Sequence, residues 1–168
     1  MDLMGLLTGA FTDPLTYSVI FFTYVVLAAI ILPIPVEVGL FNPNIHWTIL
    51  VTILAIGKGV GSLLVFQIGA TARKKIKKWS VRSSIISKFV EYAEMFVRKW
   101  GYYGLLIVLS TPLMIDSISL YLFSLLNPEE DGKRAMRRNW FVIINIIAGF
   151  IRGIITLGVA YYIGIRLV

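Results

Sequence analysis

The stretch that decides the fold is LPIPVEVGL, residues Leu32–Leu40, near the end of a long apolar segment, Leu15–Phe41. Proline has no amide donor and restricts the residue before it to extended backbone. Pro33 and Pro35 therefore predict a break in any helix that reaches them. Glu37 follows two residues after the second proline. The sequence thus predicts a helix that is interrupted inside an apolar segment, with a carboxylate next to the break.

A second segment repeats this plan. In Gly101–Leu125, Pro112 precedes Asp116 by four residues, the same spacing that separates Pro33 from Glu37. Backbone groups exposed at such a break need polar partners, and a carboxylate there can bind a proton, a cation or a basic side chain. Glu37 and Asp116 are therefore the candidate transport or proton-coupling residues, and the prolines are the candidate re-entrant breaks.

Four apolar segments account for most of the chain. Each has 24–29 residues, more than the roughly 20 that a membrane-spanning helix needs. They are Leu15–Phe41, Trp47–Ala70, Gly101–Leu125 and Trp140–Val168. Hydrophobic residues make up 58% of the 168 residues and charged residues 15%, and the mean hydropathy is +0.83. A soluble protein of this size cannot bury so much apolar surface. We therefore expect an all-α integral membrane protein with a single membrane domain, residues 1–168.

The second and fourth segments each carry a base near the middle. Lys58 and Arg152 are both followed by glycine. A charge at the centre of a bilayer costs roughly 2.5–3.5 kcal/mol even on the mildest scale, so such residues persist where they pair or line a wet cavity. We expect these two bases to bind an anionic headgroup or to pair with the two carboxylates. The alternative is two buried ion pairs that only fix helix packing.

The basic residues indicate the orientation. Nine of the 16 Lys and Arg residues lie in residues 71–100, and four more lie in the loop 127–139. The positive-inside rule predicts that both regions are cytoplasmic. Four plain crossing helices would put them on opposite sides of the membrane. The conflict disappears if the first and third segments are re-entrant hairpins, and four plain helices with proline kinks stay the alternative.

This interpretation predicts an inverted repeat, in which each half is a re-entrant helical hairpin followed by a transmembrane helix. Repeat one covers residues 15–70, and repeat two covers residues 101–168. Between them, residues 71–100 are expected to form a basic amphipathic linker helix on the cytoplasmic surface. Residues 1–14 are expected to form an interfacial N-terminal segment.

Composition excludes several classes of site. The chain has no cysteine and one histidine, His46, so we expect no disulfide, metal centre or cofactor. It has no nucleophile–base pair that would make it an enzyme. The run GKGVGS, residues 57–62, lies inside an apolar segment and is not a phosphate-binding loop. Gly57, Gly61 and Gly69 instead predict a face for close helix packing. The basic run lies between membrane segments, which argues against nucleic acid.

The chain resembles the DedA family of membrane proteins, also called the VTT-domain or SNARE-associated Golgi protein family, over most of its length. Leu32–Leu40 resembles the proline–X–proline–Ser–Glu element of that family, and Gly57–Gly69 resembles its glycine-rich helix, with Phe66 at a tyrosine position. The chain departs from the family at Val36, which replaces the serine. It also departs near Pro112, where the two arginines of many members are absent.

The resemblance implies a protein that moves lipids between leaflets, with proton or ion coupling through intramembrane carboxylates. We expect a flippase or scramblase of phospholipid or polyprenyl-phosphate type in the cell membrane. Its partners would be membrane lipids, above all those with anionic headgroups. Because a single chain would supply only two full crossings, a homodimer is also compatible with this interpretation. Two alternatives stay open: a small secondary transporter of a soluble solute, and a non-transporting membrane scaffold.

Overall fold

The computed structural model describes residues 5, 9–10, 12–31, 35–80, 84–112, 116–127, 129–130 and 133–163. Pro33 and most of the expected interfacial segment, residues 1–14, lie outside these ranges. Five α-helices dominate the described chain, so the all-α fold class is confirmed. Their bounds are α2 Pro14–Ile30, α3 Trp47–Ser80, α4 Ser84–Ser110, α5 Asp116–Leu125 and α6 Arg138–Tyr162. A 3-10 helix, η1 (Val36–Leu40), and a short antiparallel hairpin, β1 (Glu129–Glu130) with β2 (Lys133–Arg134), complete the fold.

Local sequence explains where α2 begins. The Asp13 carboxylate accepts hydrogen bonds from the Thr16 hydroxyl and from the Leu15 amide, the latter at 3.2 Å. These bonds hold the pKa of Asp13 below its usual value. Pro14 occupies the first helical position, where the missing amide would have no intrahelical partner.

Both proline-containing segments are interrupted. α2 ends at Ile30 and η1 begins at Val36, while α4 ends at Ser110 and α5 begins at Asp116. With 17 and 10 residues, α2 and α5 are shorter than the roughly 20 residues that span a bilayer.

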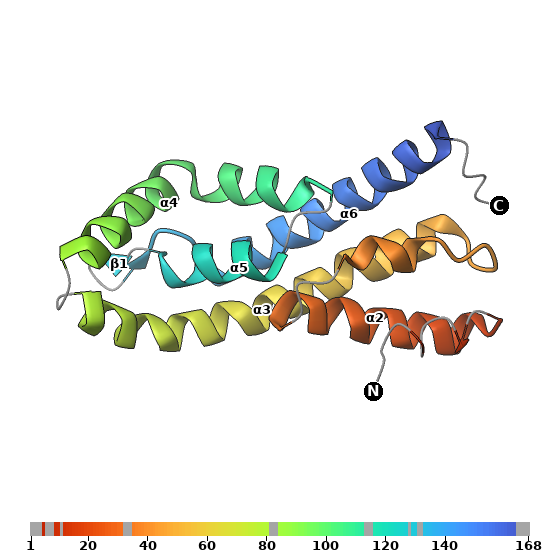
Figure 1. Ribbon diagram of the computed structural model, residues 1–168, viewed down its shortest axis with the longest axis horizontal. Coiled ribbons are helices and arrows are strands. Elements are labelled where there is room, and N and C mark those ends of the chain that lie inside the picture. The colour runs from red at the N-terminus through yellow and green to blue at the C-terminus, as the bar shows by residue number, and fades with distance from the viewer. Residues whose placement is uncertain are drawn as a thin grey trace.

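The two longest apolar stretches lie side by side. α3 and α6 pack against each other, α2 packs along α3, and α5 packs along a different part of α3 while α4 packs on α6. Figure 1 shows α2 and α5 over opposite halves of the molecule, with the end of α2 and the start of α5 near its middle. Contacts between α2 and α5 agree with this arrangement.

Two helix boundaries differ from those expected. α3 continues through residue 70 as far as Ser80, because the intervening lysines, arginine and alanine are good helix formers and nothing there ends the helix. α4 runs through residue 100 to Ser110, past Gly101 and Gly104. Residues 71–100 are therefore divided between the end of α3 and the start of α4, around residues 81–83, rather than forming one separate linker helix.

Within the part of the chain that the structure describes, two helical stretches are long and apolar enough to cross a membrane, Trp47–Gly69 and Arg138–Tyr162. Only 33% of the most apolar part of Arg138–Tyr162 is buried inside the protein. Its outward side chains are large and apolar, and they include Ile143, Ile147 and Ile154. A continuous exposed apolar face of this kind suits contact with lipid or with another apolar surface.

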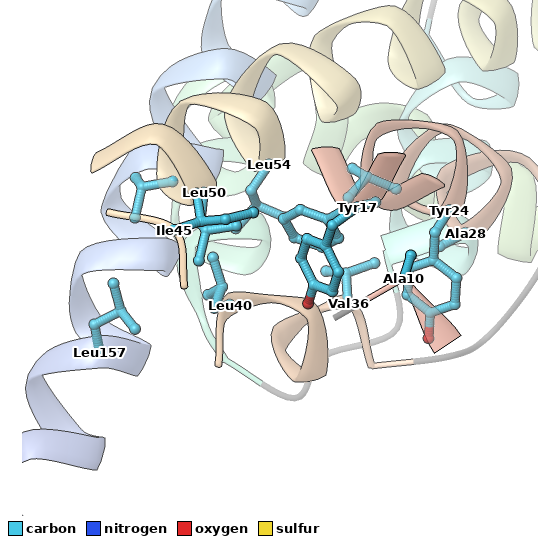
Figure 2. Packing of buried hydrophobic residues seen from close by; sticks show 13 residues of the cluster. Ala10, Tyr17, Tyr24, Ala28, Val36, Leu40, Ile45, Leu50, Leu54 and Leu157 are labelled. Carbon is cyan, nitrogen blue, oxygen red and sulfur yellow. The ribbon is translucent and has the colours of Figure 1, made fainter. Parts of the chain in front are cut away.

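Two apolar clusters lie on either side of the middle of the molecule. Figure 2 shows the first, with Tyr17, Leu40, Leu50 and Leu54 gathered between α2, η1 and α3. The Tyr17 hydroxyl also donates to the carbonyl of Gly39 at 2.9 Å, which ties α2 to η1. The second cluster joins α4 and α5 with the C-terminal half of α3 and the N-terminal half of α6. It includes Val65, Phe66, Leu105, Leu109, Leu120, Phe123, Phe141 and Ala148.

Replacing Gly149 with alanine should destabilise the contact between α3 and α6. A methyl group there would lie 2.8 Å from the Cα atom of Ala55 and 3.3 Å from Cδ of Lys58, so the two backbones must separate. We expect a loss of about 1–3 kcal/mol in the free energy of unfolding, measured by thermal or denaturant unfolding in detergent. Gly158→Ala is the control on the same helix. No atom lies within 4 Å of its added methyl group, and alanine favours helix by up to about 1 kcal/mol. Equal losses in both variants would contradict the close contact.

Candidate functional site

Four ionisable side chains from four different elements meet in the interior. They are Glu37 of η1, Lys58 of α3, Asp116 of α5 and Arg152 of α6, and we call them the ionic cluster. Only 4%, 1%, 8% and 1% of their surfaces are exposed, in that order. The structure therefore brings together both carboxylates and both bases that the sequence singles out.

Arg152 joins the two carboxylates. Its Nε donates to Oε1 of Glu37 at 2.6 Å, and its Nη2 contacts the same oxygen. Its Nη1 donates to Oδ1 of Asp116, also at 2.6 Å. One guanidinium thus connects η1, which follows α2, with the first residue of α5. Charge-assisted bonds of this length, from a planar fork of donors, are among the strongest hydrogen bonds in proteins.

Lys58 contacts Asp116 and a backbone carbonyl. Its Nζ lies 3.3 Å from Oδ1 and 3.2 Å from Oδ2 of Asp116, and it donates to the carbonyl of Leu109 at 3.1 Å. Leu109 lies in the last turn of α4, where carbonyls lack intrahelical partners, and Asp116 begins α5. The ammonium and the carboxylate therefore also complement the partial charges of the two helix ends.

The ionic cluster lies between the two apolar clusters and near the middle of both long helices. Lys58 is the central residue of Trp47–Gly69, and Arg152 is two residues past the centre of Arg138–Tyr162. Two acids and two bases make the cluster formally neutral. Removing four charges from water costs several kcal/mol per ion, and mutual pairing compensates only part of that cost. Such a cluster is a poor way to stabilise a fold, which favours a further role.

No protein-family model, curated protein or solved structure matches the chain. The geometry of the ionic cluster and its surroundings therefore carries the functional argument.

A cavity of about 230 Å³ lies beside the ionic cluster. Glu37 reaches it from η1, Pro112 from the break after α4, and the remaining wall comes mainly from the last turns of α6. Its lining residues are Glu37, Phe41, Pro112, Thr156, Val159, Ala160 and Ile163. The accessible wall is thus almost entirely apolar, and it suits an apolar group such as part of a lipid chain.

The structure also locates the predicted breaks and glycines. The carbonyl of Pro35 accepts a hydrogen bond from the Tyr24 hydroxyl at 3.4 Å. The Cα atoms of Gly57 and Gly61 face α2, where an added methyl group would come within 2.8 Å of Val25 and 2.5 Å of Ala29. Both glycines therefore allow α2 to lie close against α3.

Gly69 has a different neighbour. A methyl group there would lie 2.0 Å from Oγ of Ser124, and this hydroxyl lies 3.3 Å from the carbonyls of Val65 and Phe66. The three predicted glycines thus contact two different helices, α2 and α5, rather than one packing partner.

Two features of the site were not predicted from the sequence. The Leu109 carbonyl that binds Lys58 belongs to the backbone, and no residue pattern marks it. Thr156, on the wall of the cavity, is one of many hydroxyl residues in apolar helices, and only its distance of four residues from Arg152 would have drawn attention to it. Among the described residues, no group of three or more His, Cys, Asp or Glu side chains is placed to hold a metal ion.

Proposed function

We propose that this protein is a membrane lipid translocator, a flippase or scramblase that moves phospholipids or polyprenyl phosphates between leaflets. The observation that carries the proposal is the buried, charge-balanced ionic cluster, which lies at the middle of two apolar helices and beside a mainly apolar cavity. A headgroup needs polar partners at mid-membrane depth, whereas its chains need none, and this site offers that combination.

The proposed architecture is an inverted repeat. In the first repeat α2 and η1 form a re-entrant hairpin and α3 crosses the membrane. In the second the end of α4 and α5 form the hairpin and α6 crosses. The short lengths of α2 and α5 and their meeting near the middle of the molecule support this assignment (Figure 1). The resemblance to the DedA family supports it independently.

The ionic cluster suggests how a headgroup would be accepted. A phosphate can replace a carboxylate on the guanidinium of Arg152, because both groups match its fork of donors. Glu37, which lines the cavity, is the carboxylate that an entering headgroup meets first. When it separates from Arg152, the link between the two proposed hairpins is broken, and they are free to move relative to each other. Protonation or ion binding at Glu37 or Asp116 would favour the same separation.

Lipid is a better fit than a soluble solute because of the apolar surfaces around the site. The cavity wall contains Phe41, Val159 and Ile163, and the outward face of α6 is also apolar. A pathway for a soluble solute would be expected to carry polar side chains along its length.

The orientation can be tested with single cysteines, because the chain has none of its own. In sealed vesicles of known orientation, Lys78→Cys and Ala135→Cys are expected to react with a membrane-impermeant thiol reagent from the cytoplasmic side. Asn44→Cys is expected to react from the other side. If Lys78→Cys and Ala135→Cys react from opposite sides, the re-entrant arrangement is wrong.

Lipid movement itself can be measured in liposomes with fluorescently labelled lipids. Purified protein is expected to move lipid faster than the protein-free rate, and Glu37→Gln and Asp116→Asn are each expected to slow it by at least ten-fold. Vesicle leakage and protein content are measured in parallel as controls. The proposal fails if the unsubstituted protein moves no lipid, and the role of the carboxylates fails if both variants move it at the original rate.

A further inference from the structure

Two tyrosines of α2 bind the backbone on either side of Glu37. The Tyr24 hydroxyl donates to the carbonyl of Pro35 at 3.4 Å. The Tyr17 hydroxyl donates to the carbonyl of Gly39 at 2.9 Å. These carbonyls lie two residues before and two residues after Glu37 in the chain. The α2 helix thus holds this segment at two points, and the carboxylate that belongs to the ionic cluster lies between them.

A third residue of α2 sets how closely η1 approaches. Tyr17, Phe21 and Tyr24 follow one another at spacings of four and three residues, so they share one face of the helix. At most 1% of each is exposed. A methyl group on Gly39 would overlap the ring of Phe21, so only glycine lets the backbone of η1 lie against this ring. Figure 2 shows Tyr17 extending from α2 toward η1.

The two hydroxyl groups meet a requirement that the broken helix creates. Carbonyls at a break inside an apolar segment need donors from the protein, because hydrocarbon supplies none. Phenylalanine would fill nearly the same volume as tyrosine, so packing alone does not require the hydroxyl groups. A buried hydroxyl without a partner costs free energy, and here both have partners. The two bonds therefore fix the backbone that carries Glu37.

The ionic bond of Glu37 depends on where that backbone lies. Nε of Arg152 donates to Oε1 of Glu37 at 2.6 Å. Charge-assisted bonds of this kind weaken steeply when the donor and the acceptor separate or lose their alignment. Only 4% of Glu37 and 1% of Arg152 are exposed, so little water can replace a lost bond. A displaced η1 would therefore leave both groups buried and poorly paired.

We propose that Tyr17 and Tyr24 are positioning residues, whose hydroxyls hold η1 where the carboxylate of Glu37 meets the guanidinium of Arg152. Tyr17 makes the shorter bond and contributes more. The inference rests on the proposed function for its effect on transport. When a headgroup replaces Glu37 on Arg152, the two hydroxyl bonds keep η1 on α2. The carboxylate then returns to the same guanidinium after the headgroup leaves.

The alternative is that the two bonds only satisfy backbone carbonyls. Removing a hydroxyl would then weaken the fold to the same extent whether or not residue 37 carries a charge. If the hydroxyl positions the carboxylate, its removal also weakens the ionic bond, and that part of the loss is absent once Glu37 is replaced. Combined substitutions therefore distinguish the two roles.

The test measures the free energy of unfolding of the purified full chain in detergent for Tyr17→Phe, Glu37→Gln and the two combined. The combined loss is expected to be clearly smaller than the sum of the single losses. In liposomes, Tyr17→Phe is expected to slow lipid movement about five-fold and Tyr24→Phe about two-fold. Neither substitution should slow lipid movement further in protein that already carries Glu37→Gln.

Tyr102→Phe is the matched control. The Tyr102 hydroxyl also takes part in a hydrogen bond, which it accepts from the backbone amide of Arg137 at 2.8 Å. This bond joins α4 to the residue before α6, outside the ionic cluster. We expect the loss of stability from Tyr102→Phe and the loss from Glu37→Gln to add, and lipid movement to stay unchanged in Tyr102→Phe.

Three results would overturn the inference. They are additive losses for Tyr17→Phe with Glu37→Gln, an equal departure from additivity for Tyr102→Phe, and lipid movement that Tyr17→Phe leaves at the original rate.

The unfolding measurements use no liposomes, so they separate this inference from the proposed function. Coupling between residues 17 and 37 in a protein that moves no lipid would support the positioning role and end the proposed function. Additive losses in a protein that does move lipid would have the opposite meaning.

Discussion

Replacing Arg152 with methionine is expected to lower the free energy of unfolding by about 3–5 kcal/mol, because two buried carboxylates would then share a single ammonium. The guanidinium now bonds to Glu37 and to Asp116, and the Lys58 ammonium contacts Asp116. Methionine keeps most of the volume of the side chain, so lost packing contributes little. Denaturant unfolding in detergent, followed by tryptophan fluorescence, measures the effect.

A second substitution tests whether charge is the cause. Combining Glu37→Gln with Arg152→Met leaves one carboxylate and one ammonium, which already contact each other. We expect the double variant to be about 1–3 kcal/mol more stable than the sum of the two single effects predicts. Arg138→Met, at the exposed start of the same helix, is the control and should change stability by no more than about 0.5 kcal/mol. Strictly additive effects would show that the two residues are not coupled.

Replacing all four residues of the ionic cluster with apolar side chains should separate stability from transport. The variant carries Glu37→Leu, Lys58→Met, Asp116→Leu and Arg152→Met. Well-packed apolar residues in place of a buried ionic group are often neutral or stabilising by about 1–4 kcal/mol, so this protein is expected to fold at least as well as the original. Lipid movement in liposomes is expected to fall to the protein-free rate.

The opposite combination would favour a structural role. A quadruple variant that still moves lipid would mean that the ionic cluster only positions helices. A membrane scaffold would gain support instead if the unsubstituted protein itself moved no lipid. The matched control replaces polar residues of the same helices outside the ionic cluster, the half-buried Thr52 with valine and the exposed Arg138 with methionine, and should leave lipid movement unchanged. Unfolding curves for every variant show whether a loss of transport reflects a loss of folded protein.

Much of the candidate site followed from the amino-acid sequence. Glu37, Lys58, Asp116 and Arg152 stand alone in apolar segments, and the energetic cost of an unpaired charge there predicted that they would pair or line a wet cavity. Pro35 lies in the break between α2 and η1, and Pro112 lies in the break between α4 and α5, because proline cannot continue the backbone hydrogen-bond pattern of a helix. The role of these residues in transport stays a prediction.

Other features depend on contacts between residues far apart in the chain. The choice of partners is one: Arg152 serves both carboxylates, and Lys58 adds the Leu109 carbonyl, because of how α3, α5 and α6 cross. The ends of helices that no proline marks are a second such feature. Residues 71–80 are rich in Lys and Arg, and these residues can continue α3 as readily as they could begin a new helix. The cavity arises only from the way η1, Pro112 and the end of α6 lie against one another. Local chemistry in this chain thus dictates which residues require partners, whereas packing of distant segments selects those partners and leaves the space beside them.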